Sequence, residues 1–302
     1  EIGVNQHGVF GSSTAAPTGY HPKTIDGSLN LGFVADPEKN GWTVGNPAYY
    51  GDFFVPGIPQ EGFAVEFNGT TYRNFNSGTF NIPGANISHN TDASGVTSVW
   101  QGSVSGLQIN QKTIAPQNEV FFVVRVELTN TTAADMNNVY YMRTLDPDND
   151  VTLSTNFATL NSIIYDLPNP QNNTLVSAKG TIFTNCFLGL GTKDCRANSF
   201  ILTSGLNPQF TRPISDYHNE TANATVYSGV FSGDVAIGIT YNIGTIRAGE
   251  TKRIAFTYIL NQNDLDVALS QTLSEVFANT TTPVISGNNY TFCEGDVIPM
   301  SI

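Results

Sequence analysis

Glu119-Val-Phe-Phe-Val-Val-Arg-Val-Glu-Leu128 is the clearest strand signal in this sequence of 302 residues. Its centre is continuously apolar, and its end alternates between apolar and polar residues. This pattern predicts a central strand that is buried on both faces. The polar segment Asn130–Asn138 then predicts a turn. Val139-Tyr-Tyr-Met-Arg143 follows the turn and is expected to be the hairpin partner of the first strand.

Similar short apolar segments recur along the chain and are separated by Gly, Pro, Asn and Asp. Strands in this number and spacing are typical of two antiparallel sheets packed face to face. We therefore predict an all-β fold, a large antiparallel β-sandwich, over residues 1–282, as one sandwich or as two sub-sandwiches. The further predicted strands are Gly62–Phe67, Val96–Trp100, Thr174–Ser177, Val235–Tyr241 and Lys252–Leu260, with a turn at Thr245–Glu250 between the last two.

One segment has the periodicity of a helix. From Asn263 to Ala278, apolar residues recur at helical spacing. Packing against a sheet is the simplest explanation of such a stripe, so we predict one C-terminal packing helix. After Thr280 the composition changes. Residues 283–302 are therefore expected to form a linker and the first strand of a following module, with a boundary near Thr282.

The sequence is polar but carries few charges. Asp, Glu, Lys and Arg make up 13% of the residues, against about 25% in typical globular proteins. The formal net charge of −12 favours cations and disfavours nucleic acid phosphates and anionic membrane surfaces. No apolar run is long enough to span a membrane. We therefore expect no nucleic acid partner and no direct membrane insertion.

Asp146-Pro-Asp-Asn-Asp150 is the sharpest local feature. Carboxylates at alternate positions can converge on one hard cation, and calcium takes about six to eight oxygen ligands. We predict a calcium site formed by Asp146, Asp148, Asn149 and Asp150. The segment is not an EF-hand, because the Gly and Glu that an EF-hand requires downstream are absent. The alternatives are an acidic turn whose aspartates cap backbone amides and, more weakly supported, a catalytic carboxylate pair.

The sequence lacks the motifs of common enzymes. It has no Gly-x-Ser-x-Gly elbow, phosphate-binding loop or dinucleotide fingerprint, and its four histidines form no metal-hydrolase signature. We therefore predict a protein without enzymatic activity and assign no catalytic residue. Four aromatic residues are candidates for ligand binding, because exposed rings could stack on sugars, whereas buried rings would belong to the core. These residues are Trp42, Tyr49, Tyr50 and Trp100.

Three cysteines are present. Cys186 and Cys195 flank a segment that contains glycine, and a reversal of the chain there would allow a disulfide between them in an oxidising compartment. The alternative is that they are two small buried residues on neighbouring strands. Cys293 is left over, which suggests a partner outside this sequence.

Parts of the sequence resemble exported bacterial proteins. Tyr290-Thr-Phe-Cys-Glu-Gly-Asp296 resembles the opening strand of the PKD- or Ig-like repeats in giant cell-surface proteins of Bacteroidetes. Val123–Asp150, and Tyr241–Lys252 as a late hairpin, are similar to β-sandwich repeat modules of exported proteins that include adhesins of the gliding-motility type. The resemblance implies an extracellular, cell-surface location, export by the type IX route and further domains in the same chain. It also places the partner of Cys293 in the rest of the repeat.

These observations favour a cell-surface adhesin or structural module that is stabilised by calcium and joined to further β repeats. Its expected partners are surface glycans or other cell-surface proteins. One alternative is a carbohydrate-binding domain or a carbohydrate-active lyase or hydrolase, which the aromatic residues and the scattered carboxylates suggest. Another is a subunit that self-assembles into a surface filament through unpaired edge strands.

Overall fold

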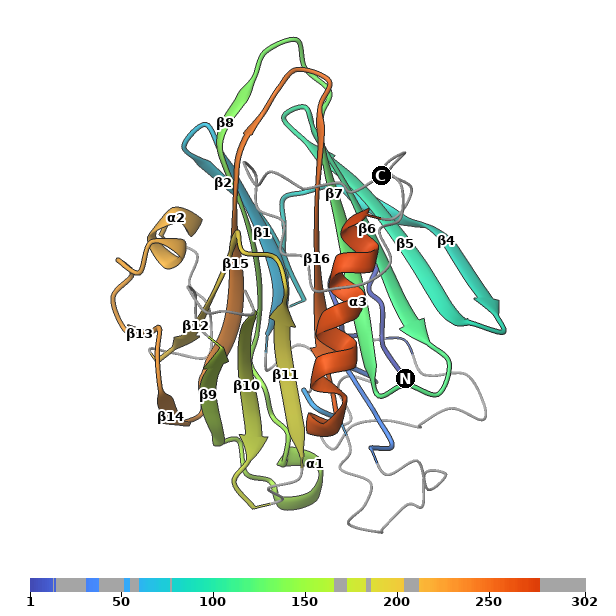
Figure 1. Ribbon diagram of the computed structural model, residues 1–302, viewed down its shortest axis with the longest axis vertical. Coiled ribbons are helices and arrows are strands. Elements are labelled where there is room, and N and C mark those ends of the chain that lie inside the picture. Colours follow the sequence, from blue (N-terminus) through green and yellow to red (C-terminus); the bar gives the residue numbers. More distant parts are fainter. Residues whose placement is uncertain are drawn as a thin grey trace, which may run out of the picture.

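The computed structural model describes residues 1–12, 14, 31–37, 52–54, 60–76, 78–165, 173–182, 186–203 and 212–277. In these residues, two antiparallel sheets pack face to face, and a long helix near the end of the described chain covers one of them (Figure 1). The predicted β-sandwich with one C-terminal packing helix is therefore confirmed. No helix of the described residues is long and apolar enough to cross a membrane.

Seven strands of the described residues form one sheet and nine form the other. In spatial order, the seven-stranded sheet contains β13 (Thr225–Val226), β12 (Ala197–Leu202), β15 (Ala236–Ile246), β8 (Met136–Leu145), β1 (Glu61–Phe67), β2 (Thr70–Phe75) and β3 (Thr79–Phe80). The nine-stranded sheet contains β14 (Val230–Gly233), β9 (Thr159–Tyr165), β10 (Thr174–Gly180), β11 (Phe187–Thr192), β16 (Thr251–Ile259), β7 (Phe121–Asn130), β6 (Leu107–Pro116), β5 (Gly95–Val104) and β4 (Gly84–Asp92). The helices are α1 (Val151–Ser154), α2 (Ile214–His218), the 3₁₀-helix η1 (Gln262–Asp264) and α3 (Leu265–Phe277).

The main hydrophobic core lies between the two sheets. Along β6, buried residues that include Leu107 and Ile109 alternate with partly exposed ones, as expected of a strand with one face on a core. Segments that precede the first strand also enter this core. They contribute Val9, Phe10, Phe33, Phe53 and Phe54. The core is therefore built from both sheets together with chain segments outside them.

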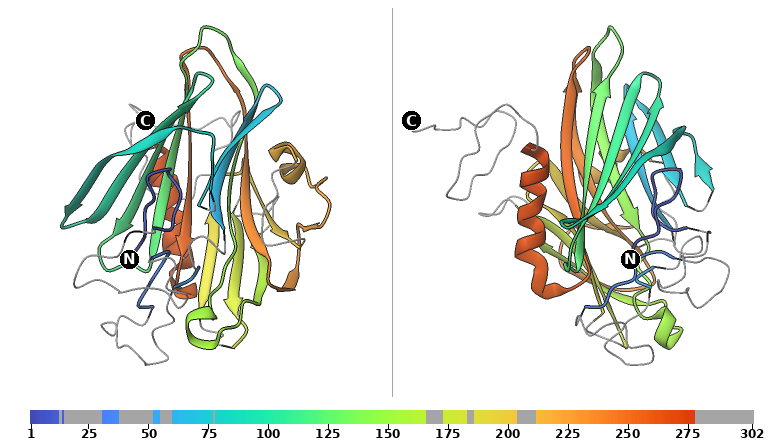
Figure 2. Two further views of the ribbon diagram at one scale, coloured as in Figure 1. Left: turned by 180° about the vertical axis from the view of Figure 1, so that it is seen from behind. Right: turned by 90° about the vertical axis from the view of Figure 1, so that its right-hand side faces the viewer.

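β7 is covered on both faces, as its sequence predicts. Val124 and Val126 belong to the core between the sheets, whereas Phe121 and Val123 pack in a second apolar cluster. α3 supplies Leu265, Ala268 and Leu269 to this cluster. Figure 2 shows α3 lying against the outer face of the nine-stranded sheet. The continuous apolar centre of the strand is thus explained by a helix on one side and the second sheet on the other.

The predicted hairpin between β7 and β8 is wrong, because these strands lie in different sheets. β15 and β16 are also in different sheets, and both connections cross the sandwich side by side at one end (Figure 1). Asn130 explains this arrangement. Its buried side-chain amide donates to the carbonyls of Ala134 and Ile246, at 2.8 and 3.0 Å, and so links the two connections. A buried asparagine therefore fixes a change of sheet where the pattern predicted a simple turn.

The predicted disulfide between Cys186 and Cys195 is also wrong. Cys186 is a free, buried cysteine, whereas Cys195 is disulfide-bonded. The segment between them does not reverse direction, because six of its residues form the strand β11. A strand of this length spans about 20 Å, whereas a disulfide requires Cα atoms within about 7 Å of each other. For Cys186, the alternative of a small buried residue is correct.

Trp100 is buried, so its predicted role in ligand binding is wrong. Its side chain is 2% exposed, and its indole nitrogen donates to the carbonyl of Gln6 at 3.0 Å. Gly8 lies against the ring with a φ of 75°, and a Cβ atom there would approach the indole to 2.5 Å. Trp100 is therefore core. The other predicted ligand-binding residues lie outside the described residues, as do the boundary near residue 282 and the segment 283–302; they are Trp42, Tyr49 and Tyr50.

Candidate metal centre

Two neighbouring strands place three aspartates at one end of the seven-stranded sheet. β8 ends at Leu145, which lies opposite Ile237 in the antiparallel strand β15. Asp146 and Asp148 follow the end of β8, and Asp234 precedes the start of β15. Antiparallel pairing brings the end of one strand beside the start of the next. The three side chains therefore meet although Asp234 is distant in the sequence.

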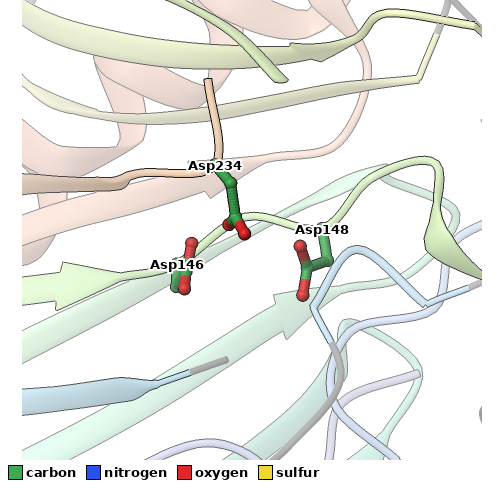
Figure 3. Close-up of side chains that lie close together, drawn as sticks. All are labelled: Asp146, Asp148 and Asp234. Atoms are coloured by element: carbon green, nitrogen blue, oxygen red, sulfur yellow. The ribbon is translucent and has the colours of Figure 1, made fainter. Parts of the chain in front are cut away.

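These three residues, here called the aspartate group, turn their carboxylates toward one another (Figure 3). One oxygen from each lies within 4.8 Å of the others. Asp146 and Asp148 are each 1% exposed, whereas Asp234 is exposed. In the described part of the chain, the Oδ1 atoms of both buried residues have no hydrogen-bond partner. An unpaired buried carboxylate oxygen is costly, and a proton, a cation or a water molecule can supply the missing partner.

The surroundings of the aspartate group disfavour negative charge. Burial raises the pKa of Asp148 to about 9, with smaller contributions from the negative charges of Asp146, Asp234 and Asp52. Burial raises the pKa of Asp146 to about 8, and the charge of Asp234 adds to this effect. The pKa of Asp234 is also raised by burial. None of these causes is a positively charged group, so the described residues do not neutralise the aspartates.

Asp52 lies near the aspartate group but is held differently. Its carboxylate accepts the backbone N–H groups of Gly32 and Phe33 at 2.7 and 2.8 Å, and that of Phe54 at 3.2 Å. Burial raises the pKa of Asp52 to about 7, while these hydrogen bonds oppose the rise. Asp52 therefore joins two segments of the core, and its charge adds to the negative potential at Asp148.

Asn149 and Asp150, the other two predicted ligands, make contacts with the nine-stranded sheet. The Asn149 amide nitrogen donates to two backbone carbonyls on that side, while its Oδ1 has no hydrogen-bond partner, so its role as a ligand stays a prediction. Asp150 accepts the backbone N–H of Ile182 at 2.7 Å and lies outside the aspartate group. The role of Asp150 as a ligand therefore stays a prediction, and the aspartate group adds Asp234, which the sequence did not suggest.

Sequence reasoning missed Asp234 for a clear reason. It follows Gly233 and directly precedes the predicted strand Val235–Tyr241, where a turn is sufficient to explain an aspartate. Its spacing from Asp146 matches no metal-binding motif. The usable signal was an aspartate at the start of one strand and an acidic loop at the end of another. It becomes informative only when the two strands are known to pair.

The donor atoms of the aspartate group suit a hard cation. Calcium takes about six to eight oxygen ligands and tolerates irregular geometry. Three carboxylates supply between three and six oxygens, depending on whether each binds through one oxygen or two. Zinc and copper are more often held by imidazole or thiolate groups, which the aspartate group does not contain. The residues of the aspartate group therefore fit a hard cation that prefers oxygen ligands, and calcium is one such ion.

A second group of buried charges lies in the core and is neutralised within the chain. Arg143 on β8 and Glu61 on the neighbouring strand β1 form an ion pair, and both side chains are fully buried. Glu61 also accepts the hydroxyl of Tyr258 at 3.0 Å and the backbone N–H of Phe10 at 2.7 Å. Arg143 donates further to the side-chain oxygen of Gln111 at 3.0 Å. Burial raises the pKa of Glu61, and the charge of Arg143 opposes this rise.

The chain matches no protein-family model and no curated protein. Several solved structures match this chain at low identity. The match to a bacterial glucoamylase complexed with acarbose covers 72% of this chain and 29% of the glucoamylase chain, at 10% identity and a TM-score of 0.45. The match to a polysaccharide lyase covers 91% of this chain and 34% of the lyase chain, at 12% identity and a TM-score of 0.37. The match to a putative aldose 1-epimerase from Klebsiella pneumoniae subsp. pneumoniae covers 93% of this chain and 80% of the epimerase chain, at 11% identity and a TM-score of 0.39.

The chain thus spans only 29% and 34% of the first two of these proteins. At these identities and TM-scores, the names of the neighbours assign no activity to this chain.

Proposed function

We propose that this chain is a non-enzymatic, extracellular β-sandwich module whose aspartate group binds calcium. In this proposal, the ion joins the loop after β8 to the segment before β15 and stabilises this end of the sandwich. The module belongs to a longer cell-surface protein, in which it serves adhesion or a structural purpose.

One observation supports the calcium site above all others. Asp146 and Asp148 are almost completely buried, their Oδ1 atoms have no hydrogen-bond partner in the described part of the chain, and a third carboxylate lies beside them. Ionised carboxylates in such a place cost several kcal/mol each unless a charge of opposite sign is present. A calcium ion supplies that charge and replaces the lost water with direct contacts. With the ion bound, the three aspartates stabilise this end of the sheet.

The extracellular location and the longer parent protein are supported by the sequence. The low content of charged residues and the net charge of −12 suit a polar, β-rich exported module. The resemblance of Tyr290–Asp296 to the opening strand of PKD- or Ig-like repeats supports further domains in the same chain. Export by the type IX route belongs to the same proposal.

Isothermal titration calorimetry with CaCl2 tests the calcium site. The wild-type chain is expected to bind one calcium ion, and its melting temperature should rise when EDTA is replaced by CaCl2. At a free calcium concentration of 100 times Kd, the expected stabilisation is about 2.7 kcal/mol. Asp148→Asn keeps the size of the side chain but removes a charged ligand, so both the heat of binding and the rise in melting temperature should be lost.

Asp266→Asn is the matched control, because it removes a carboxylate from the exposed surface of α3. This variant should bind calcium as the wild type does. A wild-type chain that shows no heat of binding and the same melting temperature in EDTA and CaCl2 would contradict the proposal. Release of reducing ends from a panel of polysaccharides would contradict its non-enzymatic part.

A further inference from the structure

Residues 146–150 cross from one sheet to the other. Their first part carries two members of the aspartate group, at the end of the seven-stranded sheet. Asn149 then donates from its side-chain nitrogen to the carbonyl of Ala178 on β10, at 2.9 Å, and to that of Cys186 just before β11, at 2.8 Å. Both strands belong to the nine-stranded sheet. The loop is therefore attached to both sheets, through the aspartates on one side and Asn149 on the other.

The thiol of Cys186 lies directly behind this loop. Its Sγ atom donates to the backbone carbonyl of Asn149 at 3.1 Å, and the residue is 0% exposed. Cys186 is a free thiol, whereas Cys195 is disulfide-bonded. Cys186 is therefore closed to a reagent in solution, and Asn149 is one of the residues that lie against its sulfur.

We infer that calcium acts as a latch: the ion that binds the aspartate group holds Asn149 in place and thereby controls access to the Cys186 thiol. The inference rests on the proposed calcium site. Asp148 and Asn149 are adjacent in the chain, so an ion that fixes the first residue also fixes the second. Without the ion, the start of the loop is held by backbone hydrogen bonds to Gln60 and Phe53, at 2.8 and 3.0 Å, and the buried carboxylate oxygens favour moving toward water.

The size of the effect follows from binding linkage. An ion that binds only the closed loop lowers the population of the open loop by the factor 1 + [Ca²⁺]/Kd, which is about 100-fold at 100 times Kd. A thiol reaction that requires opening slows by the same factor when closing is fast. Opening exposes one loop rather than the whole core. The free energy of opening should therefore depend much less on urea concentration than the free energy of global unfolding does.

Maleimide labelling of the full chain tests the latch at constant pH, with mass spectrometry to locate the label. The labelling rate of Cys186 in EDTA is expected to exceed its rate in saturating CaCl2 by about 100-fold, and the rate in EDTA should change little with low concentrations of urea. Calorimetry on the same sample measures calcium binding separately. Cys186→Ser should abolish the calcium-sensitive label, which confirms the identity of the thiol.

Asn149→Ala removes the two side-chain hydrogen bonds to the carbonyls of Ala178 and Cys186 but keeps all three aspartates. This variant should label faster than the wild type in both CaCl2 and EDTA, while a heat of calcium binding remains. Asn90→Ala is the matched control, since Asn90 lies on the exposed strand β4, where its side-chain nitrogen donates to a carboxylate oxygen of Asp92. It should label at the wild-type rates in both conditions.

The outcomes separate the latch from the calcium site. Calcium binding with equal labelling rates in EDTA and CaCl2 overturns the latch and leaves the calcium site standing. Labelling in EDTA with the full urea dependence of global unfolding also overturns the latch. Absence of calcium binding overturns both.

Discussion

The two groups of buried charges in this protein differ in where their counter-charge comes from. In the core, Glu61 is paired with Arg143 and accepts the hydroxyl of Tyr258. At the end of the same strand β8, Asp146 and Asp148 are nearly as buried, but the charged group beside them is a third carboxylate. Burial alone therefore does not distinguish a structural charge from a binding site. The source of the counter-charge does, because a group that the chain leaves uncompensated has to take a proton or an ion from solution.

Removal of the internal counter-charge should have the largest effect. Arg143→Met is expected to lower the free energy of unfolding by about 3–5 kcal/mol, because Glu61 remains buried without a cation. Urea denaturation in EDTA measures this loss. Saturating calcium should not restore it, since the ion binds at the other group. The double variant Glu61→Gln, Arg143→Met should recover part of the loss, and a loss below about 1 kcal/mol in the single variant would contradict this role of the ion pair.

The aspartate group should make the calcium-free protein less stable as the pH rises. The folded-state pKa values of Asp146 and Asp148, about 8 and about 9, lie above the ordinary value of 3.8. Between about pH 4 and pH 9 the folded chain binds more protons at these two residues than the unfolded chain does. Their contribution to the free energy of unfolding is therefore complete below about pH 4 and is lost as the pH rises through the folded-state pKa values. In EDTA, the expected loss between pH 7 and pH 8 is on the order of 2 kcal/mol.

Denaturation curves across this pH range provide the measurement. Calcium competes with protons for the same oxygens, so it should stabilise the chain more at pH 8 than at pH 6. The variant Asp146→Asn, Asp148→Asn lacks both titrating groups and should show a much flatter dependence in EDTA. An equally flat dependence for the wild type would show that these two residues are not the uncompensated charges.

The smallest predicted effects separate Asp234 from Asp150. Asp234→Asn should weaken calcium binding at least 10-fold, which corresponds to about 1.4 kcal/mol, because it removes a charged ligand. Asp150→Asn should change Kd less than about 3-fold, or roughly 0.6 kcal/mol, since its side chain can still accept the N–H of Ile182. Calorimetry on both variants gives the two constants. The reverse order would restore the ligand set that the sequence motif suggested.

The sequence was informative where one segment determines its own surroundings. The apolar run in β7 and the helical stripe in α3 each predicted an element that the structure contains. The Asp146 loop likewise announced two members of the aspartate group. Pairing between distant segments was not predictable. The change of sheet at Asn130 depends on contacts with a second connection, and Asp234 depends on the pairing of β8 with β15.

Buried positions were misjudged for the same reason. Trp100 carries an aromatic ring that could stack on a sugar if it were exposed. However, Gly8 and Gln6, which are far away in the sequence, lie against the ring and bury it. Cys186 and Cys195 are close in sequence, but the strand between them holds them apart. In each case the missing information was which distant segment lies alongside, and that depends on the three-dimensional arrangement of the sheets.

A crystal structure of the chain grown in CaCl2 tests the central claim most directly. We expect one calcium ion in contact with an oxygen from each of Asp146, Asp148 and Asp234, at about 2.3–2.6 Å. A structure in which this position holds no ion at saturating calcium, or in which the ion is held by Asp150 instead of Asp234, would contradict it.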